Sequence, residues 1–189
     1  MPDLWSQEEY RKAYRFAAKA HQGQRFPGTE LPYLMHLNLV CMEVMAALRA
    51  EPGHDENLAV QCVLLHDVIE DTTVTFEQVQ TTFGAAVANG VLALSKNRAL
   101  AKPEQMSDSL RRIQQQPQVV WMVKLADRIT NLHAPPAHWD LGKITRYQVE
   151  AQTIYEALRG ASPYLAQRIC DGPSGPVFDH RIAAYEAFQ

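Results

Sequence analysis

The chain has 189 residues, of which 47% are hydrophobic and 21% are charged, and its formal net charge at pH 7 is −3. This length fits one compact domain with a substantial core, and the composition is that of an ordinary soluble globular protein. The slightly negative balance gives no reason to expect nucleic acid or an anionic membrane surface as a partner, so an anionic ligand would need a local positive patch or a metal.

The cysteines and the terminal sequence indicate the compartment. Cys41, Cys62 and Cys170 are widely spaced and include no CxxC pair, which is typical of buried thiols in a reducing cytoplasm. No apolar run approaches the roughly 18 residues of a membrane span, and the N-terminal sequence lacks the basic and apolar regions of a signal peptide. We therefore expect a cytoplasmic protein without membrane or nucleic-acid partners, and the sequence favours no particular oligomeric state.

The first part of the chain predicts two helices and a loop. Ser6 followed by Glu9 predicts a capping box that opens a helix through about residue 20. The segment 22–32 contains two prolines and two glycines, so we expect a loop there. A second helix is expected at about 33–50, where a Pro-Gly turn signal follows it.

The central part of the chain contains three further helix signals. The sequence LLHDVIED is predicted to lie in one helix, which starts near 55–57 and continues to about Glu70. Thr75 and Gln78 indicate the start of a short helix with the sequence FEQVQTTF. Small residues follow Gly84 in VANGVLALS, and they would allow another helix to pack closely against its neighbours.

The second half of the chain is also predicted to be helical. The polar segment 96–107 is expected to be a mobile loop before a helix that Ser107 opens, which continues to about residue 115. We interpret 118–132 as one buried helix, because its apolar residues continue a period of 3.6. Further helices are expected at about 141–159, 164–170 and 179–188. Together these elements predict one all-α bundle of eight to ten helices, with 1–189 as a single domain.

Four ionisable side chains are concentrated in LLHDVIEDTT, at positions 64–73. Their burial among apolar neighbours would cost stability unless something pairs them. On a helix, Glu70 lies one turn beyond His66, and Asp71 lies one turn beyond Asp67, on the same side. An imidazole and a carboxylate are suitable ligands for manganese, iron or zinc. The segment therefore predicts a His–Asp pair that binds a metal, with two carboxylates above it near a ligand.

A catalytic divalent ion usually needs at least three protein ligands, and two other segments offer candidates. His36 follows the proline-containing loop in PYLMH, at the start of the second helix. Asp127 lies in the apolar segment KLADRITNL, where a buried carboxylate requires a cation. Lys124 and Arg128 are the alternative partners for that carboxylate.

The order H … HD … D, at positions 36, 66–67 and 127, resembles the metal signature of the HD-domain phosphohydrolases. The segments AHQGQRFPGTELPYLMH, LLHDVIEDTT and VKLADRITNL follow one another as in the hydrolase domain of Rel/SpoT-type enzymes, and the chain looks most like the stand-alone small alarmone hydrolases. The resemblance covers roughly 13–160, and C-terminal helices occupy 161–189. Several motifs in order are far more specific than one HD dipeptide.

The resemblance implies a role for each matching position. The implied metal ligands, usually for Mn²⁺, are His36, His66, Asp67 and Asp127. The residues implied to position and deprotonate the attacking water are Glu70 and Asp71. The residues implied to contact the nucleotide are Arg25 and Asn131. The implied reaction removes the 3′-pyrophosphate from guanosine tetra- or pentaphosphate and gives GDP or GTP and pyrophosphate.

The chain departs from the family pattern at three places. Phe26 stands where a second basic residue is common, and Ala134 stands where Rel enzymes tend to have a hydroxyl. The segment 96–100 is basic where related loops often start acidic, so Lys96 or Arg98 can supply the missing charge near the pyrophosphate. These differences do not involve the proposed metal ligands. They concern which base and which 5′-phosphate of the nucleotide the protein prefers.

Two alternatives stay open at this point. The chain could be an HD phosphohydrolase for another nucleotide, such as NADPH or a deoxynucleotide, which the departures at Phe26 and Ala134 favour. It could also be a non-catalytic HD module that only binds a nucleotide. The intact Glu70 and Asp71 argue against this second alternative.

Overall fold

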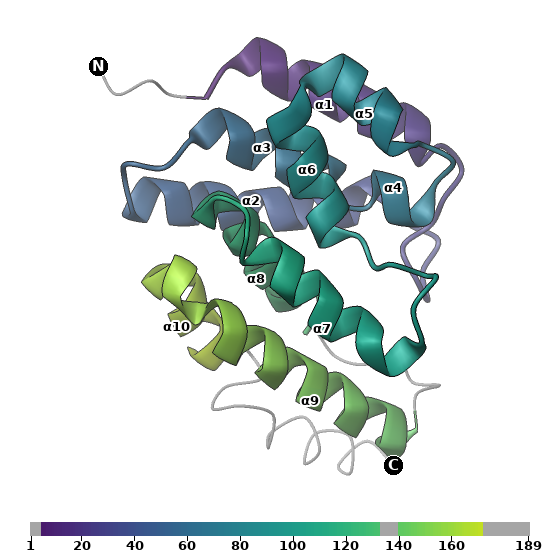
Figure 1. The fold of residues 1–189 in the computed structure, drawn as a ribbon, viewed down its shortest axis with the longest axis vertical. Helices are drawn as coiled ribbons and strands as arrows, with labels where there is room; N and C mark the ends of the chain where they lie inside the picture. Colours follow the sequence, from purple (N-terminus) through teal and green to yellow (C-terminus); the bar gives the residue numbers. More distant parts are fainter. Residues whose placement is uncertain (1–4, 133–139, 172–189) are drawn as a thin grey trace.

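The structure is a computed structural model that describes residues 5–132 and 140–171. These residues form a bundle of helices (Figure 1), so the predicted all-α fold is confirmed. No strand occurs within the described ranges, where an isolated backbone bridge between Arg25 and Pro32 only closes a loop. The helix predicted at 179–188 lies outside the described residues.

The helices of the described residues follow one another with short connections. Their bounds are α1 Gln7–Ala20, α2 Leu34–Ala50, α3 Glu56–Leu65, α4 Val68–Asp71, α5 Phe76–Phe83, α6 Ala85–Leu94, α7 Lys102–Ile113, α8 Gln118–Asn131, α9 Leu141–Leu158, the 3-10 helix η1 Arg159–Ala161 and α10 Pro163–Asp171. Among the described helices, none combines the length and the apolar content that a bilayer crossing requires.

Side-chain caps explain where several helices begin. The Ser6 hydroxyl accepts a hydrogen bond from the backbone N–H of Glu9 at the start of α1. Thr75 and Gln78 form a reciprocal capping box at the start of α5, as the sequence predicts. Each of these caps pairs a backbone donor that the first helical turn would otherwise leave unsatisfied.

The prediction of one continuous helix from 55–57 to Glu70 is wrong, because the chain is interrupted at His66 and Asp67. Helix α3 ends at Leu65, and the four-residue helix α4 begins at Val68. Asp67 has φ −103° and ψ −2°, which departs from helical values and lies in the bridge region where active-site residues often occur.

The start that the sequence predicts for the next helix is also wrong. Helix α7 begins at Lys102 rather than at Ser107, with a proline in its first turn. Proline is well tolerated there because the first turn leaves its backbone donors unpaired. Ser107 therefore lies inside the helix, where its hydroxyl donates to the carbonyl of Glu104. The predicted polar loop consequently ends at about residue 101.

Three helices form the centre of the bundle and bring distant motifs together. Helices α2, α3 and α8 pack against one another, and α9 and α10 cover α8 on the side away from α1 and α5 (Figure 1). Every residue from Leu58 to Leu65 is buried, which explains why this stretch is almost continuously apolar. The packing places His36 on α2, the junction after α3, and Asp127 on α8 beside one another.

Candidate active site

Two histidines and two aspartates from three segments meet in the interior. The Nε2 atom of His36 lies 3.4 Å from Asp127 Oδ1 and 3.6 Å from Asp67 Oδ2. The Nε2 atom of His66 lies 2.8 Å from Asp67 Oδ2 and 3.9 Å from Asp127 Oδ1. Both imidazoles are buried, so these groups interact with little screening by water.

Neighbouring groups fix the orientation of two members of this cluster. His66 Nδ1 lies 2.7 Å from the carbonyl oxygen of Val63 and donates to it in the neutral ring, which leaves the Nε2 lone pair facing the aspartates. The Tyr33 hydroxyl donates a hydrogen bond of 2.6 Å to Asp67 Oδ2. These contacts hold one imidazole and one carboxylate in place before any ligand binds.

Asp127 lies between the two kinds of partner that its sequence context predicts, a basic side chain on one side and other proposed metal ligands on the other. The Lys124 ammonium donates to its Oδ2 atom at 3.0 Å, so an internal salt bridge forms on one side. Its Oδ1 atom faces the two imidazoles and accepts a hydrogen bond of 2.5 Å from the Asn131 side-chain amide. Helical spacing explains both contacts, because these partners lie three residues before and four residues after Asp127.

The buried charges shift one another's pKa values. Burial lowers the pKa of His36, but the hydrogen bonds and charges of Asp127 and Asp67 outweigh burial and raise it to about 9. Burial also lowers the pKa of His66, but the charge and hydrogen bond of Asp67 outweigh burial, so the pKa is raised overall. Burial raises the pKa of Asp67, yet His66 and His36 hold it well below its usual range. The cluster therefore favours positive charge, which protonated imidazoles or a cation can supply.

The donor set fits a divalent cation. Ligand atoms of His36, His66 and Asp67 all lie within 4.8 Å of one another, and Asp127 lies beside both imidazoles. His66 Nε2 is buried and faces Asp67 Oδ2 at 2.8 Å and Asp127 Oδ1 at 3.9 Å, so in the neutral ring its lone pair and the carboxylate oxygens are directed to one place, as a bound ion requires. Mixed imidazole and carboxylate donors are typical of sites for manganese, iron and zinc.

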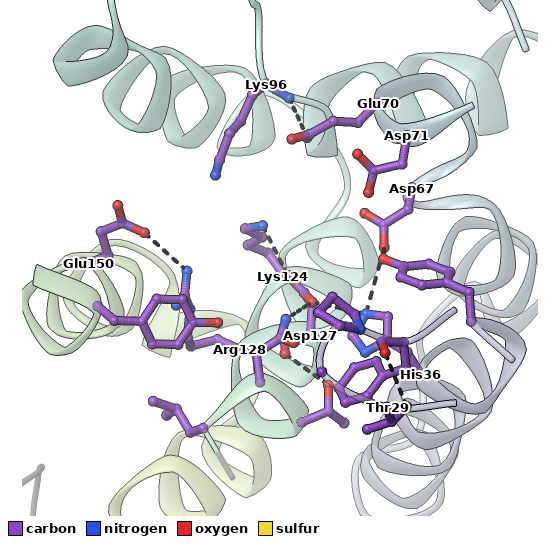
Figure 2. Close-up of a pocket in the computed structure, with 18 of the residues that line it drawn as sticks. Thr29, His36, Asp67, Glu70, Asp71, Lys96, Lys124, Asp127, Arg128 and Glu150 are labelled. Atoms are coloured by element: carbon purple, nitrogen blue, oxygen red, sulfur yellow. Dashed lines mark hydrogen bonds and ion pairs between the residues drawn. The ribbon is translucent and has the colours of Figure 1, made fainter. Parts of the chain in front are cut away.

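Glu70 and Asp71 lie next to this cluster, and the segment after α6 holds both of them. In Figure 2 the carboxylates of Asp67, Asp71 and Glu70 follow one another along one side of the pocket. Glu70 Oε2 accepts a hydrogen bond of 2.8 Å from the backbone N–H of Lys96. Asp71 Oδ1 accepts one of 3.2 Å from the Arg98 guanidinium.

Asp71 is electrostatically suited to accept a proton. Burial raises the pKa of its carboxyl group, and the negative charges of Asp67 and Glu70 raise it further, against the opposing effect of Arg98. A carboxylate with a raised pKa is a stronger base than an ordinary aspartate. The arrangement can therefore bind a cation at one place and remove a proton from water beside it.

A pocket of about 460 Å³ adjoins these groups and has a size suited to a small ligand. The loop 26–29 forms one wall, and residues of α8 and α9 form another. Lys96, Lys124 and Arg128 contribute cationic side chains to its lining (Figure 2). The carboxylates of Asp67, Glu70, Asp71, Asp127 and Glu150 line it as well, so an anionic ligand would be favoured here only together with a cation at the His–Asp cluster.

The structure separates the predicted nucleotide contacts into two groups. Asn131 and Lys96 line the pocket, and Phe26 lines it as well, with its ring 5.8 Å from that of His36. Arg25 and Arg98 do not line it; Arg25 is exposed and pairs with Glu30. Ala134 lies outside the described residues.

Two residues of the site were not assigned their roles from the sequence. Tyr33 lies three residues before His36, so helical spacing would have indicated that both face the same region. Arg128 is buried on the opposite side of the pocket from Glu70, with its guanidinium 4.3 Å from the Tyr147 ring and 3.6 Å from Glu150. The sequence indicated Arg128 only as a counter-ion, because its neighbours on α9 are distant in the chain.

Comparison with known proteins identifies the family of this chain. The sequence model of the HD domain matches residues 13–163, so the chain belongs to the HD domain family. It is 31% identical to guanosine-3′,5′-bis(diphosphate) 3′-pyrophosphohydrolase MESH1 of Xenopus tropicalis over 163 residues, which are 84% of this chain and 89% of that protein. The human protein of the same name is 29% identical, with the same coverage of both chains.

A solved structure agrees with these sequence matches. It was reported as the structure of a metazoan ortholog of SpoT that hydrolyzes ppGpp and plays a role in starvation responses. Its TM-score is 0.73 at 27% identity, and the match covers 88% of this chain and 94% of that one. The resemblance to Rel/SpoT-type hydrolases, and to their stand-alone members in particular, is thereby confirmed.

Proposed function

We propose that this protein is a metal-dependent phosphohydrolase that removes the 3′-pyrophosphate from guanosine tetra- or pentaphosphate, giving GDP or GTP and pyrophosphate. The observation that carries this proposal is that the buried His–Asp cluster lies beside Glu70 and Asp71 along one pocket. The names of the similar proteins support the choice of substrate. Free cysteines without a pairing pattern support a cytoplasmic location.

The proposed metal ligands are His36, His66, Asp67 and Asp127, and the proposed ion is Mn²⁺. When bound, a divalent ion would lower the pKa of water and neutralise phosphate charge. The chain prepares the site for it, because Val63 fixes the ring of His66 and Tyr33 fixes the carboxylate of Asp67. This preorganisation limits the rearrangement that binding requires.

Glu70 and Asp71 are proposed to orient the attacking water and to accept its proton at a carboxylate oxygen. The bond from Lys96 fixes one oxygen of Glu70, which leaves the other for the water. The raised pKa of Asp71 makes it a stronger base than an ordinary aspartate. The water is the nucleophile, so this mechanism requires no serine or cysteine.

The nucleotide contacts follow from the lining of the pocket. Asn131 is proposed to meet the ribose or a phosphate, and Lys96 is proposed to meet the 3′-pyrophosphate, because both line the pocket. Arg98 and Arg25 would have to leave their ion pairs with Asp71 and Glu30 to reach a substrate. Phe26 provides an aromatic surface in the pocket against which a base can stack.

The proposal is tested by incubating protein reconstituted with Mn²⁺ separately with guanosine tetraphosphate, a deoxynucleoside triphosphate and NADPH, and by identifying the products. We expect pyrophosphate and GDP from guanosine tetraphosphate and far slower turnover of the others. Turnover of NADPH or of the deoxynucleotide alone would favour a different HD phosphohydrolase. Binding without turnover of any of them would indicate a non-catalytic module.

A further inference from the structure

A groove of about 650 Å³ adjoins the active-site pocket and shares Glu70 and Lys96 with it. The end of α6, the segment 95–98 and one face of α7 enclose it. Its charged lining residues are four cations and two acids, namely Lys96, Arg98, Arg111, Arg112, Glu70 and Asp108. The groove is thus locally positive, although the formal net charge of the chain is −3.

The cations of the groove are not all engaged in the same way. Arg112 is held within the fold, because its guanidinium bonds to Asp108 and to the carbonyls of Leu92 and Ser95. Arg111 is exposed and pairs with the same Asp108, which therefore faces two guanidinium groups with one negative charge. One positive charge of this group is left without a counter-charge among the described residues.

The segment 95–98 adds two more cations and connects the groove to the active site. Within the described part of the chain, the Lys96 ammonium makes no ion pair. Arg98 is 70% exposed and pairs with Asp71, while the backbone N–H of Lys96 bonds to Glu70. Any ligand that moves this segment therefore disturbs the proposed bases directly.

We propose that this groove binds free inorganic pyrophosphate, and that the bound anion inhibits turnover by displacing the segment 95–98, whose Lys96 backbone N–H holds the carboxylate of Glu70 in place. A small, highly charged anion suits a shallow site lined by guanidinium and ammonium groups, which bind phosphate oxygens well. The choice of pyrophosphate rests on the proposed function, which releases this product at the adjoining pocket. The anion site itself rests only on the charges and contacts of the groove.

Binding is tested with metal-depleted protein, so that pyrophosphate cannot be held by an ion at the His–Asp cluster. Isothermal titration with sodium pyrophosphate compares the unchanged protein with Arg111→Gln and Arg11→Gln. Arg11 is the matched control, because it is exposed and pairs with Glu8 at 2.5 Å across three residues, as Arg111 pairs with Asp108.

We expect one pyrophosphate to bind per protein molecule. Arg111→Gln should weaken the affinity for pyrophosphate about tenfold, because it removes one charge-assisted contact. Arg11→Gln should bind as the unchanged protein does. Absence of binding, or equal effects of both substitutions, would overturn the site. GDP is titrated in parallel, and an effect of Arg111→Gln on GDP instead of pyrophosphate would assign the groove to a nucleotide and overturn the product assignment.

The inhibition is tested with the metal-loaded enzyme and guanosine tetraphosphate. Arg111→Gln should leave turnover without added pyrophosphate unchanged and should raise the pyrophosphate concentration for half-inhibition about tenfold. Equal inhibition of both proteins would overturn the regulatory role. Failure of the proposed reaction would appear as absent turnover with the Arg111-dependent binding intact, so the two proposals fail separately.

Discussion

Asp67 is the residue on which the contacts of the site converge. It lies between two helices, and its Oδ2 atom is 2.6 Å from the Tyr33 hydroxyl, 2.8 Å from His66 and 3.6 Å from His36. The Tyr33 hydroxyl is the contact among these three that orients the carboxylate without competing for an ion. The Tyr33 hydroxyl therefore acts as a positioning group for the proposed ligand.

Replacement of Tyr33 by phenylalanine tests this positioning role. Tyr33→Phe removes the hydroxyl and keeps the ring, so we expect Mn²⁺ affinity to fall by about tenfold, as is typical when a partner of a metal ligand is removed. Titration calorimetry on the metal-depleted protein measures the affinity. Tyr14→Phe, at a half-buried tyrosine on α1, is the control and should bind the ion normally. Equal affinities of the two variants would contradict the role.

The sequence predicts the chemical role of single residues better than it predicts which residues contact one another. His36, His66, Asp67 and Asp127 were indicated by residue type and motif order, and the fold brings them together. Contacts between segments were not predictable in this way. The bond from the Lys96 backbone to Glu70 depends on how α6 packs against α4, which no local pattern specifies.

At the scale of helices, α6 shows how close packing is achieved in this bundle. A Cβ atom at Gly90 would lie 2.8 Å from Cys62 Sγ on α3 and 3.1 Å from a methyl group of Val120 on α8. Both neighbours are fully buried and have short side chains that cannot swing aside. The glycine therefore sets the distance at which α6 approaches the central helices.

Gly90→Ala is expected to destabilise the protein despite the better helix propensity of alanine. The propensity gain is about 1 kcal/mol, whereas overpacking of a buried site costs about 1–3 kcal/mol. Urea unfolding should show a net loss of up to about 2 kcal/mol in the free energy of unfolding. Gly160→Ala is the control, because nothing lies within 4 Å of its added Cβ. A more stable Gly90→Ala protein would show that this contact relaxes freely.

Helix boundaries were predictable where a local signal decides them. The Thr75–Gln78 capping box and the caps of α1 and α3 use side chains within a few residues, so sequence alone indicates them. The interruption at His66–Asp67 was not predictable, because helix propensity and periodicity continue through it. The side chains of His66 and Asp67 lie against His36 on α2 and Asp127 on α8, and helix propensity does not describe such contacts between distant segments.

At the scale of the whole molecule, the site joins the three helices that form its centre. His36 belongs to α2, His66 and Asp67 to the junction after α3, and Asp127 to α8. Because these helices also pack against one another, a bound ion would crosslink the core. Metal binding and folding are therefore expected to be thermodynamically linked.

Metal removal should lower the thermal stability of the protein. An ion at a hundred times its dissociation constant stabilises the folded state by about 2.7 kcal/mol, so chelation should lower the melting temperature by several degrees. Differential scanning calorimetry with and without EDTA measures the change. Asp67→Ala should melt at the same temperature in both conditions, and a shift as large as that of the unchanged protein would contradict the proposed ligand set.

We propose that His66 and Asp67 bind the ion, whereas Glu70 and Asp71 orient and deprotonate the attacking water. Mn²⁺ binding and hydrolysis of guanosine tetraphosphate, measured on the same preparations of Asp67→Ala and Glu70→Ala, test this proposal most directly. We expect Asp67→Ala to lose both Mn²⁺ binding and hydrolysis, whereas Glu70→Ala should bind Mn²⁺ normally and lose turnover. Loss of metal binding in Glu70→Ala, or full activity in either variant, would contradict the division of roles.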